Sequence, residues 1–97
     1  MKLLLTIVRD DDASEVVDAL TEHGFGVTRL TSTGGFLRMG NTVLLSGIED
    51  NQLDEVLEIM RAHTEIHVVP PSSRVTEETK VRRAVVFILG MEGIVKL

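Results

Sequence analysis

The stretch KLLLTIVRDDDASEVVDALTEH, residues 2–23, is matched without a gap by TVLLSGIEDNQLDEVLEIMRAH, residues 42–63. Each copy has an apolar run, an acidic turn and an amphipathic stretch, which together describe two β-α-β halves in tandem. The identical pairs are Leu4 and Leu44, Leu5 and Leu45, Asp10 and Asp50, Glu15 and Glu55, Val16 and Val56, and His23 and His63. Two such halves that interleave make a ferredoxin-like βαββαβ sandwich, an α+β fold with an antiparallel sheet and two helices on one face.

The first half predicts a buried strand over Leu3–Val8 and a helix over Ala13–His23. We expect Asp12 and Glu15 to form a capping box, and Gly24 to end the helix in the left-handed conformation. The apolar residues fall at i, i+3, i+4 and i+7 in both copies, as a helix that packs on a sheet requires. They are Ala13, Val16, Val17 and Leu20 in the first copy and Leu53, Val56, Leu57 and Met60 in the second.

Further strands are expected at Phe25–Leu30 and, after the second helix, at Glu65–Val69. The run RAVVFILG, Arg83–Gly90, is the most β-prone in the chain and competes with Glu65–Val69 for the place of the fourth strand. Val75–Val81 is polar and is expected to be a loop, and Ile94–Leu97 could add one short edge strand.

Composition bounds the class of protein. The length of 97 residues fits one domain over residues 1–97, and 43% apolar residues with three Phe and no Trp or Tyr predict an aliphatic core. A net charge of −5 and the lack of any basic run longer than Arg82-Arg83 argue against a nucleic-acid polymer as partner. No apolar run approaches the roughly 18 residues of a membrane span, and the absence of cysteine suits a cytoplasmic protein. A mean hydropathy of +0.18 indicates apolar surface that oligomerisation would cover.

Candidate reactive groups favour structural interpretations. Asp10–Asp12 could bind Mg²⁺ or Ca²⁺, but acidic residues are also typical of a helix N-terminus. His23, His63 and His67 lack metal-site spacing, and the first two stand where helices end. No serine has the GxSxG context of a nucleophile. We therefore expect no enzyme, no catalytic or metal-ligating residue, and no cofactor.

The segment TSTGGFLRMGNT, Thr31–Thr42, is longer than the two to five residues of an ordinary hairpin connection. It could be a long hairpin, with glycines for positive φ. It could instead be a ligand loop, because backbone N–H groups around Gly34 and Gly35 can form an anion-binding nest. In that case hydroxyls would bind phosphate or ribose and apolar side chains would cover a purine. The residues concerned are Thr28, Thr31, Thr33, Phe36 and Leu37, with Arg38 adding charge.

In this segment the chain resembles the PII-like cyclic-di-AMP receptor family. The resemblance lies in MKLLLTIVRDDD (1–12), ALTEHGFGVTRLTSTGGFLRMGNTVLLSGIED (19–50) and VVFILG (85–90). It implies a ferredoxin-like protomer, a homotrimer, and a ligand pocket between neighbouring subunits whose loops reorder and contact a partner protein. The ligand-binding residues that it implies are Thr28, Gly35, Phe36, Leu37, Asn41 and Gly47, to which the loop chemistry adds Thr33 and Gly34.

The chain departs from that family in three places. Gly24 and Gly26 stand where the receptors have Asn and Arg, Lys96 stands where they have Gln, and the loop after the second helix is shortened to about Pro70–Arg82. The sequence therefore predicts a trimeric signalling protein that binds an adenine nucleotide or dinucleotide, with cyclic di-AMP the first candidate. Binding would regulate an unknown partner protein. The alternative is an oligomeric protein-interaction scaffold without a small ligand, which Gly24 and Gly26 favour. Metal binding of the CutA-like kind has little support.

Overall fold

The computed structural model describes residues 1–30, 40–64, 67–69, 79–81 and 84–97. Helices and strands alternate in the order that the tandem sequence predicts, followed by a short hairpin and a last long strand. The elements are β1 (Lys2–Arg9), α1 (Asp10–Glu22), β2 (Thr28–Leu30), β3 (Asn41–Ile48), the 3₁₀ helix η1 (Asp50–Gln52), α2 (Leu53–Ala62), β4 (His67–Val69), β5 (Thr79–Val81) and β6 (Ala84–Gly90).

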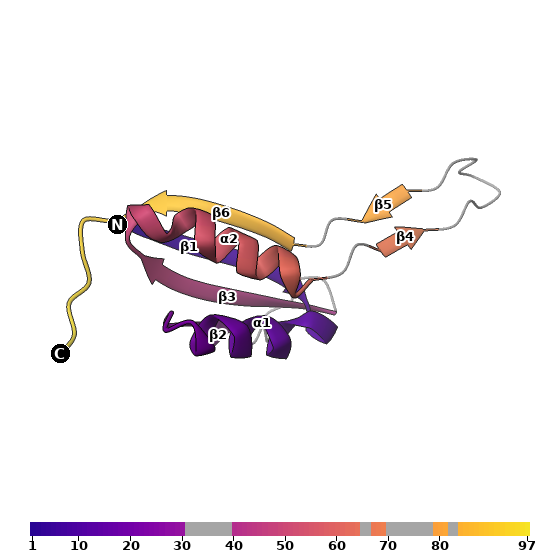
Figure 1. The fold of residues 1–97 in the computed structure, drawn as a ribbon, viewed down its shortest axis with the longest axis horizontal. Coiled ribbons are helices and arrows are strands. Elements are labelled where there is room, and N and C mark those ends of the chain that lie inside the picture. The colour runs from indigo at the N-terminus through magenta and orange to yellow at the C-terminus, as the bar shows by residue number, and fades with distance from the viewer. Residues whose placement is uncertain (31–39, 65–66, 70–78, 82–83) are drawn as a thin grey trace.

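The main sheet is four-stranded, with the order β2-β3-β1-β6 and every neighbouring pair antiparallel. This is the ferredoxin-like arrangement, so the predicted α+β sandwich is confirmed. The fourth place belongs to β6, so of the two competing runs it is the one predicted over Arg83–Gly90 whose described residues, 84–90, supply that strand. Strands β4 and β5 pair only with each other, in a two-stranded sheet that lies beyond the end of the main sheet (Figure 1).

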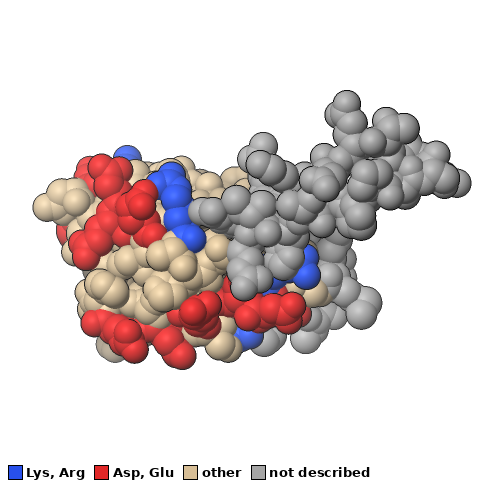
Figure 2. Space-filling model, turned by 45° about the vertical axis from the view of Figure 1, so that its right-hand side comes forward, with Lys and Arg blue, Asp and Glu red and all other residues tan. Residues whose placement is uncertain are grey.

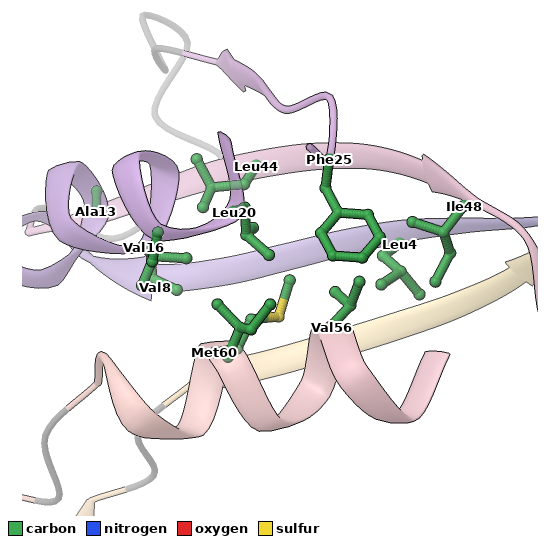
Figure 3. Packing of buried hydrophobic residues seen from close by; sticks show 12 residues of the cluster. Leu4, Val8, Ala13, Val16, Leu20, Phe25, Leu44, Ile48, Val56 and Met60 are labelled. Carbon is green, nitrogen blue, oxygen red and sulfur yellow. The ribbon is translucent and has the colours of Figure 1, made fainter. Parts of the chain in front are cut away.

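The hydrophobic core lies between the sheet and the two helices (Figure 3). Leu4 of β1 and Leu44 of β3 meet residues from both helices there, so α1 and α2 pack on the same face of the sheet. The core is aliphatic apart from Phe25, as the composition predicts. Its buried members are Leu4, Val8, Ala13, Val16, Ala19, Leu20, Phe25, Leu44, Ile48, Val56, Ile59 and Met60.

Helix α1 starts at Asp10, earlier than predicted, and its N-cap residue is Arg9 without a side-chain cap. The expected capping box of Asp12 and Glu15 is therefore wrong. Strand β1 runs directly into the helix, so the three aspartates occupy the first turn, where negative charge complements the helix dipole. A capping box does form in the second half, between Glu49 and Gln52.

The predicted C-terminal stop of α1 at Gly24 is confirmed. Gly24 has a φ of +84°. Its N–H donates to the Thr21 carbonyl at 3.0 Å, and the Phe25 N–H donates to the Leu20 carbonyl at 2.9 Å. These two bonds make a Schellman motif, and the buried side chains of Leu20 and Phe25 supply its hydrophobic contact.

Three predicted boundaries need correction. Strand β2 begins at Thr28 rather than Phe25, because Phe25 turns into the core to complete the Schellman motif. The described end of the expected loop Val75–Val81 forms β5, which pairs with β4. Residues 65–66 of the strand predicted over Glu65–Val69 lie outside the described residues. Ile94–Leu97 forms no strand, since the Met91 N–H donates to the Met1 carbonyl at 3.0 Å and the chain then leaves the sheet.

Candidate functional site

The predicted ligand-binding residues divide into two groups. Thr33, Gly34, Gly35, Phe36 and Leu37 lie outside the described residues, so the anion nest and the apolar cover stay predictions. The other three residues are described. Thr28 is the first residue of β2, Asn41 is the first residue of β3, and Gly47 lies one residue before the end of β3.

All three described residues lie on the face of the sheet that is turned away from the helices, which we call the open face. In β1 the residues Leu4, Thr6 and Val8 are buried toward the helices, so the alternate residues face the other way. The cross-strand pairs Arg9–Asn41, Leu3–Gly47 and Thr28–Leu45 place the partners on this same face. The apolar residues of the open face are Leu3, Leu5, Ile7, Leu30, Val43, Leu45, Val85, Phe87 and Leu89.

Within one chain the described candidate site residues lie toward two different ends of the sheet. Asn41 is the first residue of β3 and Gly47 is its last but one. A rise of about 3.3 Å per residue separates them by about 20 Å. Thr28 pairs with Leu45 and so lies toward the Gly47 end. The structure therefore brings Thr28 near Gly47 and keeps both away from Asn41.

The Asn41 end is fixed by hydrogen bonds. Gly40 has a φ of +93°, and its carbonyl accepts the Asp10 N–H at 2.8 Å. The Thr42 hydroxyl donates to Asp10 Oδ1 at 2.5 Å. The first aspartate of the triplet thus anchors the point where the chain enters β3. No group of three or more His, Cys, Asp or Glu suited to a metal ion occurs among the described residues.

Two of the three histidines take the helix-end positions that the sequence predicts. His23 Nδ1 lies 2.8 Å from the Ala19 carbonyl oxygen at the end of α1. His63 follows α2, and its Nδ1 lies 3.4 Å from Glu15 Oε1 on α1, without a hydrogen bond between them. His67 lies in β4, four residues after His63.

The Gly47 end contains a contact that sequence reasoning missed. A Cβ atom added to Gly47 would lie 2.9 Å from Ile94 Cδ1 and 3.2 Å from Met91 Cε. The segment after β6 therefore packs over this glycine, whose lack of a side chain makes the room. No motif in the sequence pairs Gly47 with Met91 or Ile94.

Gly24 and Gly26 stand where the resemblance expects side chains, and they differ in backbone conformation. Gly24 needs its positive φ, which asparagine tolerates better than other residues do. Gly26 is exposed, has no positive φ, and has no atom within 4 Å of an added Cβ. A long side chain at residue 26 would thus meet no steric obstacle among the described residues.

Comparison with known proteins identifies the family. The model of the family described as "Cyclic-di-AMP receptor" matches residues 1–97. The chain belongs to this cyclic-di-AMP receptor family. This family is one of PII-like signalling proteins, so the resemblance seen in the sequence is confirmed.

The chain is also similar to two other known proteins. A GlnB-like protein 1 of the nitrogen fixation nifHD region, from Methanothermococcus thermolithotrophicus, is 31% identical over 75 residues, 64% of this chain and 71% of the relative. A crystal structure of a functionally unknown protein from Pediococcus pentosaceus matches with a TM-score of 0.75 and 31% identity. That match covers 99% of this chain and 96% of the solved one.

The surface of this family member is acidic over the helices. On the face that Figure 2 shows, acidic side chains of the described residues cover broad areas and basic ones are scattered. Asp11, Glu15 and Asp18 of α1 are among the exposed acids, and α2 adds Asp54, Glu55 and Glu58. No helix in the described part of the chain is long and apolar enough to cross a membrane.

Proposed function

We propose that this protein is a cytoplasmic PII-like signal transducer that forms a homotrimer and binds an adenine nucleotide, cyclic di-AMP first, in the clefts between subunits. Binding orders the loops at 31–42 and 70–82, and these loops then regulate a partner protein. Membership of the cyclic-di-AMP receptor family supports the ligand class. The observation that supports the intersubunit position is the separation of Asn41 from Gly47 along β3.

The separation argues for two protomers at each site. A nucleotide in contact with both residues of one protomer would have to reach across about 20 Å of strand. A site formed by the Asn41 end of one protomer and the Gly47 end of its neighbour needs no such reach.

The open face supplies a surface for that association. Phe87 is 52% exposed and Leu89 46% exposed, and both lie beside the half-buried leucines of β1. Contiguous apolar surface of this kind is typical of protein–protein contacts, since exposing it to water is unfavourable.

Replacing Asn41 with alanine tests the ligand site. Cyclic di-AMP at 100 times its dissociation constant should stabilise the wild-type protein by about 2.7 kcal/mol, and the Asn41→Ala variant should lose most of this gain. A thermal-shift titration against a panel of adenine and guanine nucleotides measures both. The unliganded melting temperature should change little, because Asn41 is half-buried at a strand end.

Asn51→Ala provides the matched control, because Asn51 is exposed in η1, away from the open face. It should respond to ligand as the wild type does. A shift with another nucleotide would reassign the ligand. No shift with any nucleotide would contradict the proposal and favour the scaffold alternative.

Gly26→Arg should strengthen binding of cyclic di-AMP, by about 1–3 kcal/mol, because it restores a cation that can bond or stack on a base. The open surroundings of Gly26 accept the longer side chain. Isothermal titration calorimetry of the variant against the wild type gives the difference. Gly26→Glu places a side chain of opposite charge at the same position and should not strengthen binding; an equal gain from both variants would rule out the guanidinium as the cause.

A further inference from the structure

Arg9 lies beside the predicted ligand residue Asn41 on the open face. It is the last residue of β1 and the cross-strand partner of Asn41, the first residue of β3. Directly opposite residues of an antiparallel pair have Cβ atoms about 5 Å apart. The guanidinium of Arg9 and the amide of Asn41 can therefore reach the same small group.

The hydrogen bonds around Asp10 hold this pair in register. The Asp10 N–H donates to the Gly40 carbonyl, and its carboxylate accepts the Thr42 hydroxyl. Asp10, which follows Arg9, is thus hydrogen-bonded to the residues on both sides of Asn41. A ligand would meet a preorganised cation and amide at this end of the sheet.

The Arg9 side chain is half-buried, and its Nε atom is buried without a hydrogen-bond partner in the described part of the structure. Leaving a buried N–H unpaired is unfavourable. The chain has fifteen acidic residues against ten basic ones, yet no carboxylate of a described residue forms an ion pair with Arg9. By contrast, Arg61 pairs with Glu58, and Arg29 donates to Ser14.

We propose that Arg9 is a ligand-contacting residue that donates to a phosphate oxygen of the bound nucleotide, next to the amide of Asn41. The inference rests on the proposed function and names the group that its site recognises. Arginine suits this role because its planar fork can donate two parallel N–H bonds to a phosphate. Gly26 stands where the receptors have an arginine, so this chain lacks that positive charge. In the proposed site between two protomers, Arg9 supplies a positive charge from the Asn41 end instead.

The acidic residues of α1 restrict how Arg9 can act. Asp10, Asp11 and Asp12 follow it directly in the first turn of the helix. Their charges oppose a long-range attraction of anions to this end of the sheet. Arg9 therefore acts through directed hydrogen bonds at short range, which makes the shape of the guanidinium matter as well as its charge.

The test compares Arg9→Gln and Arg9→Lys with Arg61→Gln. Arg61 lies on α2, on the other side of the sheet from the open face, and is exposed, so its variant makes the same change of side chain away from the proposed site. Titration calorimetry with cyclic di-AMP at two salt concentrations should show at least tenfold weaker binding for Arg9→Gln. Arg9→Lys should fall between it and the wild type, and Arg61→Gln should stay within twofold of the wild type. The affinity of Arg9→Gln should also depend less on salt, because one charge–charge contact that salt screens is lost.

Several outcomes would overturn the assignment. The first is binding by Arg9→Gln within twofold of the wild type, and the second is an equal loss in Arg61→Gln. The third is dissociation of the unliganded oligomer of Arg9→Gln in sedimentation. The last would mean that Arg9 pairs with a neighbouring protomer. If the wild type does not bind cyclic di-AMP, that ligand is wrong, and pyrophosphate becomes the probe. Stabilisation of the wild type but not of Arg9→Gln by pyrophosphate would keep Arg9 as an anion-binding residue, and no stabilisation of the wild type would overturn it.

Discussion

Phe87→Asp should convert the proposed trimer into monomers. Phe87 is 52% exposed on the open face and pairs with Leu5 across β1 and β6. Association through this face would bury the new carboxylate among apolar side chains, and an unpaired buried charge costs several kcal/mol. Sedimentation velocity at micromolar protomer concentration should show the change in mass, and circular dichroism should show that the fold is kept.

Ile88→Asp is the matched control for this prediction. Ile88 is the next residue of β6, is 48% exposed, and pairs with Leu4 on the side of the sheet that faces the helices. It should lower the stability of the protomer and leave the assembly trimeric. Equal dissociation of both variants would contradict the open-face contact, and a wild type that is itself monomeric would contradict the intersubunit site.

Leu20→Ala should lower the free energy of unfolding by about 3 kcal/mol, since truncation of a buried leucine leaves a cavity as well as losing apolar burial. Leu20 has no exposed surface, and its side chain lies near Phe25 and Leu44 in the core (Figure 3). For a domain of this size the melting temperature should fall by roughly 12–24 °C. Calorimetry at a fixed protomer concentration measures this, because oligomerisation makes the melting temperature depend on concentration.

The same substitution at Leu57 serves as a comparison. Leu57 lies on α2 and is only half-buried, so Leu57→Ala should cost about half as much as Leu20→Ala. Equal losses would show that the stability of the fold does not centre on the helix–sheet core.

The helices and their apolar stripes were predictable because, in each copy separately, apolar residues recur with the 3.6-residue period of a helix. Val16 and Val56 are both fully buried, as the tandem match requires. The start of α1 was not predictable, since aspartate suits both an N-cap and a first turn, and Asp12 could be read as either. Only the direct passage from β1 into α1 decides between them.

The sequence predicts a set of candidate site residues but not how they are arranged in space. Alternation within a strand predicts which residues share a face, yet the register between distant strands sets which residues stand side by side. That register pairs Arg9 with Asn41 and leaves Gly47 at the far end of β3. For the same reason no pattern in the sequence places Arg9 beside Asn41, and the contact of Ile94 with Gly47 had no signal in the sequence.

The place of β1 in the sheet has a consequence for biosynthesis. This first strand is hydrogen-bonded on one edge to β3 and on the other to β6. During translation one edge of β1 must therefore stay unpaired until residues 84–90 have left the ribosome. Such sequence-distant pairing slows folding, and an exposed apolar strand edge invites wrong partners meanwhile. The nascent chain is thus most prone to aggregation in the interval between synthesis of α2 and release of β6.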